Sequence, residues 1–106
     1  METLKITSID LRFTLVFLSD KDYTYGIEEE FKFRFSNGEF VSCIRRCCKY
    51  IDKKEFSLGT TDDHKYLINE FITFTQNSWI SKKRKEFLKD SVDGCQSKIF
   101  RRDTWK

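Results

Sequence analysis

One stretch of this chain, EEEFKFRFSNGEFVSCIRRCC, constrains the fold more than any other, because it has the pattern of a β-hairpin. Phe31, Phe33 and Phe35 alternate with polar residues, and this period of two is typical of a half-buried strand. Asn37-Gly38 follows them, and this dipeptide is favoured in two-residue hairpin turns because both residues tolerate positive φ. The pattern predicts two antiparallel strands with a phenylalanine face that another layer covers.

A two-residue turn would also fix the register of the hairpin. It places Phe35 opposite Phe40, and on the other face it places Glu30 opposite Arg45. Opposite charges on facing strands contribute roughly 0.2–1 kcal/mol, so this register is locally consistent.

The second arm of the hairpin has a competing interpretation. Its apolar residues also fit a helical stripe, formed by Phe40, Ile44, Cys47, Cys48 and Ile51. We favour a strand over residues 39–47 because Asn-Gly is a strong hairpin signal.

The remaining elements predict an α+β fold in a single domain, residues 1–106. Long strands are expected over residues 3–18 and from Tyr23 into the hairpin, and a short one around residues 56–58. Together they form an antiparallel meander of about four to five strands in the N-terminal half. Helices are predicted over about residues 62–77 and 81–91, and they would pack against the sheet. The tail from Cys95 onward is either an edge strand or mobile.

Neither end of the chain predicts an association with membranes. The first residues, METLKITSID, lack the basic and then apolar pattern of a secretory signal. No apolar run approaches the ~20 residues that a membrane span needs. We therefore expect a cytoplasmic protein without a membrane partner.

The cysteines and the single histidine give little support to metal binding or catalysis. Cys43, Cys47 and Cys48 cluster and Cys95 is distant, a spacing that fits buried free thiols better than a zinc site. His64 is expected in the first turn of a helix, as a solvated residue. Known local signatures of nucleophiles, phosphate loops and metalloproteases are not found. We expect no enzyme activity, no cofactor and no metal.

Charge is distributed unevenly along the chain. Residues 1–77 carry 11 basic and 13 acidic side chains, whereas residues 78–106 carry 9 basic and 4 acidic ones. Such segregation steers the approach of a charged partner. The basic run on the second helix is Lys82, Lys83, Arg84 and Lys85.

In size, composition and architecture the chain resembles bacterial immunity proteins, and this resemblance transfers no individual residues. It implies a cytoplasmic inhibitor that forms a heterodimer with a cognate protein toxin, of contact-dependent inhibition or another interbacterial system, and blocks its active site. If the toxin is a basic nuclease, acidic side chains would mimic the phosphates of its substrate. The candidate contacts are Asp20, Asp22, Glu28, Glu29, Glu30, Asp62 and Asp63.

A second hypothesis uses the basic C-terminal face instead. A small nucleic-acid-binding protein, or a phage-encoded regulator of the anti-CRISPR type, would bind phosphates through the residues from Lys82 to Lys85. The same residues would contact a toxin that presents an acidic surface.

Overall fold

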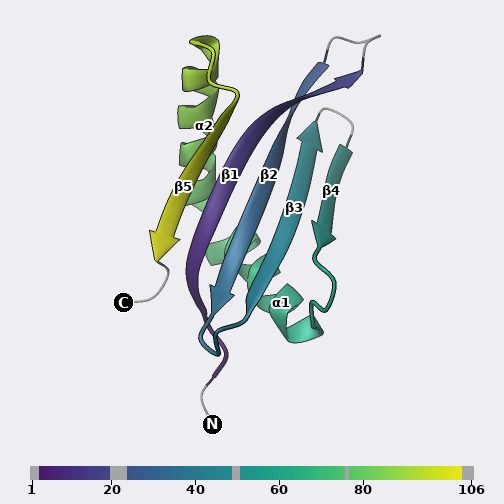
Figure 1. Cartoon of the computed structure of the whole chain (residues 1–106), viewed down its shortest axis with the longest axis vertical. Coiled ribbons are helices and arrows are strands. Elements are labelled where there is room, and N and C mark those ends of the chain that lie inside the picture. The colour runs from purple at the N-terminus through teal and green to yellow at the C-terminus, as the bar shows by residue number, and fades with distance from the viewer. Residues whose placement is uncertain (1–2, 20–23, 49–50, 76, 104–106) are drawn as a thin grey trace.

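The computed structural model describes residues 3–19, 24–48, 51–75 and 77–103. In these ranges five strands form one antiparallel sheet in the order β4-β3-β2-β1-β5. The strands are β1 (Ile6–Ser19), β2 (Thr24–Phe35), β3 (Phe40–Cys48), β4 (Ile51–Phe56) and β5 (Ser97–Asp103). The helices are α1 (Asp62–Glu70), a π-helical segment η1 (Phe71–Thr75) and α2 (Asn77–Val92). The predicted α+β fold is confirmed, and the helices lie on one side of the sheet (Figure 1).

Several predicted boundaries were wrong. The short strand is Ile51–Phe56, which begins earlier in the chain than predicted. Its charged residues gave no strand pattern in the sequence, but an edge strand tolerates them. The first helix is α-helical to Glu70 and continues as the π-helical segment η1 to Thr75, and the second begins at Asn77 and not at Ser81. For the tail, the edge-strand alternative is confirmed by β5 (Ser97–Asp103).

The strand interpretation of the second hairpin arm is confirmed, but the predicted register was wrong by one residue. The loop has three residues, because the N–H of Phe35 bonds to the carbonyl of Glu39 and the N–H of Gly38 bonds to that of Phe35. Gly38 has a φ of 87°, as expected for the bulged residue of such loops. A shift of one residue exchanges the faces of a strand, so Phe40 is 59% exposed and faces away from the helices.

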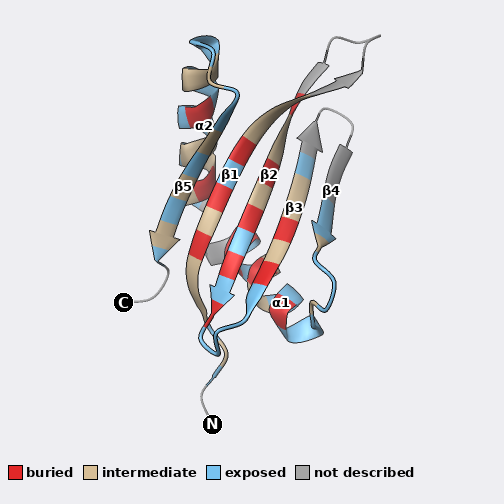
Figure 2. Cartoon of the chain, in the orientation of Figure 1, coloured by how far each residue is buried: buried red, intermediate tan, exposed pale blue. Residues whose placement is uncertain are grey.

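The core lies between the sheet and the helices. Figure 2 shows buried and less buried residues alternating along the central strands. The buried apolar side chains of the sheet are Ile9, Leu11, Phe13, Phe31, Phe33, Phe35, Val41 and Cys43. From the helical side come Ile68, Phe71, Ile72, Ile80 and Phe87. We call the helix-covered side of the sheet its inner face and the opposite side its outer face.

The two helices cover different parts of the inner face. α2 lies behind β5 and the adjacent part of β1, where Phe87 stacks on Phe13 with ring centroids 5.6 Å apart (Figure 1). α1 lies beside the lower ends of β3 and β4. The upper parts of β3 and β4 have no described helix behind them. The charged cluster described below is contacted from both helices, by Arg84 of α2 at Glu29 and by Asn69 of α1 at Lys54.

Candidate functional site

A buried carboxylate marks the inner face of the sheet. Glu29 is 0% exposed, although it lies in a strand whose other inward side chains are mostly phenylalanines. Arg84 of α2 donates two hydrogen bonds to it, from Nε to Oε2 at 2.5 Å and from Nη2 to Oε1 at 3.0 Å. Arg45 of β3 places its Nη1 3.7 Å from Glu29 Oε1. A buried charge needs such partners, because an unpaired one is strongly unfavourable.

The sheet register adds a third cation beside this group. Arg45 lies opposite Glu29 on one side and opposite Lys54 of β4 on the other. Burial raises the pKa of the nearby Cys43 thiol from 9.0 to about 11, while the charges of Lys54 and Arg45 act in the lowering direction. We call Arg45, Lys54 and Arg84, grouped around Glu29, the cation cluster.

The cation cluster is accessible to solvent, unlike its carboxylate. The side chains of Arg45 and Arg84 are 20% and 28% exposed, and Lys54 is exposed while its Nζ donates to Asn69 Oδ1 at 2.8 Å. The guanidinium groups are thus held in place by Glu29 and still reach the surface. Such preorganised arginines are well suited to bind a carboxylate or a phosphate.

Acidic and basic side chains on the outer face of the sheet form ion pairs with one another. Arg46 pairs with Glu28 and Glu55 at 3.2 and 3.3 Å, and Arg101 pairs with Asp10 at 3.3 Å. Among the described outward side chains, five acidic residues accompany five basic ones. The acidic set is Asp10, Glu28, Glu30, Glu55 and Asp103, and the basic set is Arg12, Lys32, Arg34, Arg46 and Arg101.

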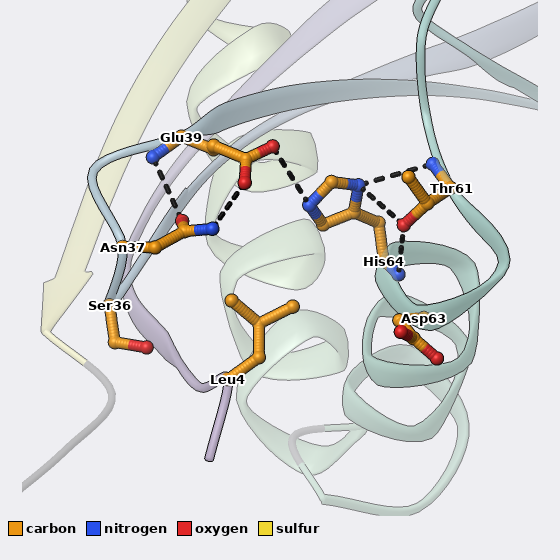
Figure 3. Close-up of a pocket in the computed structure, with 7 residues that line it drawn as sticks. All are labelled: Leu4, Ser36, Asn37, Glu39, Thr61, Asp63 and His64. Carbon is orange, nitrogen blue, oxygen red and sulfur yellow. Dashed lines mark hydrogen bonds and ion pairs between the residues drawn. The ribbon is translucent and has the colours of Figure 1, made fainter. Parts of the chain in front are cut away.

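A polar pocket of about 370 Å³ lies between the β2–β3 turn and the start of α1 (Figure 3). It is lined by Leu4, Ser36, Asn37, Glu39, Thr61, Asp63 and His64. The imidazole of His64 points toward Glu39, with Nε2 3.4 Å from Oε2. A histidine beside a carboxylate is an arrangement that also occurs in catalytic sites.

In this pocket, however, His64 has a structural role. The side chain is 3% exposed, and its Nδ1 accepts a hydrogen bond from the N–H of Thr61 at 3.1 Å. The N–H of His64 in turn donates to Thr61 Oγ1 at 3.2 Å, which completes a capping box. The ring also packs on Phe35, with ring centroids 4.6 Å apart.

The expectation of a solvated His64 was therefore wrong. Thr61 and His64 stand three residues apart at a helix start, which is the spacing of a capping box with histidine at its third helical position. This spacing was the sequence signal for the burial of His64.

The structure separates the predicted acidic contacts. Asp20 and Asp22 lie outside the described residues. Glu28 and Glu30 are half-buried on the outer face, whereas Glu29 is buried on the inner face.

Two further candidates, Asp62 and Asp63, are exposed in the first turn of α1, beside the lower ends of β3 and β4 (Figure 2). The described acidic candidates therefore lie on three separate parts of the surface or interior and do not form one patch.

The predicted basic run is also divided between two roles. Lys82 and Lys85 are exposed on the solvent side of α2, whereas Arg84 turns inward to Glu29. Lys83 pairs with Glu86 at 3.2 Å and lies over the ring of Phe100. The sequence analysis did not identify Arg45 and Lys54 as site residues. The position of Glu29 in a strand of alternating phenylalanines was a signal that this carboxylate would need a basic partner.

The described cysteines are free thiols: Cys43 is buried and Cys95 is half-buried. The side chains of Cys47 and Cys48 lie outside the described part of the structure. Among the described residues, no three His, Cys, Asp or Glu side chains are grouped closely enough to hold a metal ion.

Comparison of this chain with protein families, with curated proteins and with solved structures finds no match. In the described part of the chain, neither helix has the length and the apolar character needed to cross a membrane.

Proposed function

We propose that this chain is a protein-binding inhibitor of the immunity type, which binds a cognate toxin and covers its active site. The observation that carries this proposal is the solvent side of α2, where exposed basic and aliphatic side chains are mixed. We call this surface the α2 outer face. It consists of Lys82, Lys85, Leu88, Lys89 and Val92, and Glu86 of the same helix is also exposed.

The aliphatic residues favour a protein partner over a phosphate backbone. Leu88 is 41% exposed and Val92 is 86% exposed. They stand one helical turn apart, and lysines flank them on the same helix. Burying them in an interface would gain roughly 25 cal/mol per Å² of apolar surface, a gain that a chain of phosphates does not offer. The lysines would speed the approach of an acidic toxin surface.

The α2 outer face is supported by a rigid base. Ile80 and Phe87 anchor the opposite side of the helix in the core, and Arg84 ties it to Glu29 in the sheet. A surface fixed in this way loses little conformational entropy on binding, which is an advantage for a tight inhibitor.

The partner suggested by this surface is a toxin with an acidic rim around its active site. This differs from the basic nuclease that the acidic candidates would require. Since the candidates among the described residues are dispersed over separate parts of the molecule, the α2 outer face is the better supported contact surface.

A pull-down from the native host tests the proposal. Tagged wild-type protein is expected to capture a stoichiometric protein partner that survives nuclease treatment and moderate salt. The variant K85E/L88D, changed at two exposed positions of α2, is expected to lose that partner. The matched control is K32E/I99D, which makes the same changes at exposed positions of the outer sheet face, and it is expected to retain the partner.

The alternative function, nucleic-acid binding, draws on the three exposed lysines of the same face. Phosphate contacts are lost steeply as salt rises, because binding releases counterions. If nucleic acid and no protein is recovered, and K85E/L88D releases it, the inhibitor proposal is wrong and the alternative takes its place.

A further inference from the structure

The edge of the sheet formed by β5 carries a regular row of backbone groups that point away from the other strands. Of the described strands only β1 pairs with β5, and their register has no bulge (Figure 1). The N–H of Leu15 bonds to the carbonyl of Gln96. Because the direction of these groups alternates along an antiparallel strand, the N–H and C=O groups of Ile99, Arg101 and Asp103 point away from β1.

The side chains of this row are exposed on the outer face of the sheet. Ile99 is 56% exposed, and Arg101 and Asp103 are exposed as well. Ser97 belongs to the same row, but its carbonyl already accepts a hydrogen bond from Cys95 Sγ at 3.2 Å. The stretch open to pairing is therefore residues 99–103, beside which an extended chain can add a sixth strand.

The alternate side chains of β5 face α2 and form a basic and aromatic row. Lys83 and Lys98 lie over the ring of Phe100, with Nζ 5.1 and 5.3 Å from its centroid. Arg102 lies over the ring of Trp79 at 5.5 Å. Since α2 lies behind β5, the inward side chains of an added strand would approach this row (Figure 1).

The charge of β5 disfavours pairing with a second copy of this chain. Its charged side chains are Lys98, Arg101, Arg102 and Asp103. The register that pairs the whole strand with an antiparallel copy is centred on Phe100, and it places Lys98 opposite Arg102 twice. Like charges directly opposite each other are unfavourable, even though Asp90 pairs with Lys98 within the chain.

The same charge favours an acidic strand from a different protein. Residues 78–106, which include both α2 and β5, carry 9 basic and 4 acidic side chains. This excess attracts a segment of opposite charge. Ile99 adds an exposed apolar side chain that an apolar residue of the segment covers.

From these features we infer that β5 binds an acidic, extended segment of a partner protein as a sixth, antiparallel strand of the sheet. The inference rests on the proposed inhibitor function and identifies the chemistry of the bound part of the toxin. Residues of the segment opposite Ile99 and Arg101 exchange main-chain hydrogen bonds with β5. The residues between them direct acidic side chains inward, toward Lys98 and Arg102. In such complexes the main chain provides affinity and the alternate side chains provide specificity.

A protein strand fits this edge better than a nucleic acid for two reasons. The edge offers both N–H donors and C=O acceptors at every second residue, which match another strand, whereas a phosphate backbone offers only acceptors. Single-stranded nucleic acids stack on aromatic side chains, but the rings of Phe100 and Trp79 already contact basic side chains of this chain.

The inference can be tested with isotope-labelled wild-type protein and short synthetic peptides. The probe is a peptide in which glutamate and valine alternate, and the reference has lysine in place of glutamate. In nuclear magnetic resonance spectra, the amide signals of Ile99 and Arg101 are expected to shift with the acidic probe only. Shifts confined to β4, the other edge of the sheet, would overturn the inference.

Two methylated forms of the acidic probe test the pairing of the main chains. One carries methyl groups on the nitrogens of its valines, and the other carries them on the nitrogens of its glutamates. With glutamates directed inward, the valine N–H groups face β5, so methylation of the valines is expected to weaken binding about tenfold more than methylation of the glutamates. Equal affinities, or the reverse order, would contradict the proposed pairing.

A substitution in β5 tests the same hydrogen bonds from the other side. I99P removes an N–H that points away from β1, and proline is tolerated at such positions of edge strands. I99V keeps this N–H and is the matched control. I99P is expected to bind the acidic probe about tenfold more weakly than I99V, and similar affinities would be incompatible with an added strand. The methylated peptides use wild-type protein, so their result holds even if I99P does not fold.

Oligothymidylate and the native partner distinguish the remaining outcomes. If oligothymidylate shifts the same amide signals at lower concentration than the acidic probe, the edge binds nucleic acid and the inference is wrong. If a captured protein partner binds I99P as tightly as I99V, the inference fails while the inhibitor function stands. If the acidic probe pairs with β5 as expected but no protein partner is captured, the inhibitor function fails and the strand-binding site stands.

Discussion

Removing Arg84 is expected to destabilise the protein more than removing the charge of Glu29, although both changes break the same ion pair. In R84M the carboxylate of Glu29, which is 0% exposed in the wild type, loses both hydrogen bonds of Arg84, and Arg45 lies 3.7 Å away. Breaking a buried pair in this way costs about 3–5 kcal/mol, and we expect a value of about 3 kcal/mol because Arg45 remains.

In E29Q the remaining groups are the guanidiniums of Arg84 and Arg45. These side chains are 28% and 20% exposed, so both charges keep part of their hydration. The glutamine carbonyl can also accept one of the hydrogen bonds of Arg84. We therefore expect E29Q to cost about 1–2 kcal/mol, a value typical of one weakened charged hydrogen bond.

The double variant E29M/R84M provides the sharper comparison. It replaces the ion pair by apolar side chains, an exchange that is often close to neutral in other proteins. We expect it to cost less than R84M alone, which gives a favourable coupling of about 2 kcal/mol or more between the two positions. The control is R46M, because Arg46 is 44% exposed and its pairs with Glu28 and Glu55 should contribute less than about 1 kcal/mol.

Urea unfolding followed by circular dichroism gives the free energies of unfolding of these four variants, of the single variant E29M and of the wild type. All transitions should have similar slopes, so that differences in midpoint report stability. The argument is refuted if R84M costs no more than R46M, or if the cost of E29M/R84M equals the sum of the costs of the single changes.

Three further predictions concern the fold around the candidate sites. T61A removes the side chain that caps α1 and is expected to lower the free energy of unfolding by about 1 kcal/mol; an unchanged urea midpoint would contradict the capping role. F33A should cost about 3–5 kcal/mol, because Phe33 is 0% exposed, whereas F40A should cost less than about 1 kcal/mol, and comparable losses would be inconsistent with the observed register. The raised pKa of Cys43 predicts that stability falls as pH rises from about 9 to about 11, since the unfolded chain releases the thiol proton there and the folded chain retains it. C43V should reduce this alkaline loss by roughly 2–3 kcal/mol, and parallel pH curves for both proteins would show the prediction to be wrong.

The local pattern of the sequence determined the type of most elements. Alternating phenylalanines predicted β2 because the side-chain period of a strand is a local property. Thr60 or Thr61, followed by two aspartates, predicted the start of α1, since a helix cap depends on a few adjacent residues, and the observed cap is Thr61. The α+β class followed from the order of these elements.

The register of the β2–β3 hairpin was not determined by its turn residues alone. Asn-Gly is compatible with both a two-residue loop and the observed three-residue loop that ends at Gly38. The observed loop places Val41 and Cys43 in the core and exposes Phe40. Burial of side chains that pack against the helices favours this arrangement, and that contribution exists only after the layers have assembled.

The candidate site was decided by tertiary structure to a still greater extent. Glu29 stood out in the sequence as a charge within an apolar series, yet its partner Arg84 lies 55 residues further along the chain. Arg45 and Lys54 became neighbours of this pair only through the strand order and register. A sequence pattern records which residues are polar, whereas the pairing of charges depends on which strands and helices come together in space. Because electrostatic energy depends on distance and burial, only the folded chain determines which of its many charged residues interact strongly with one another.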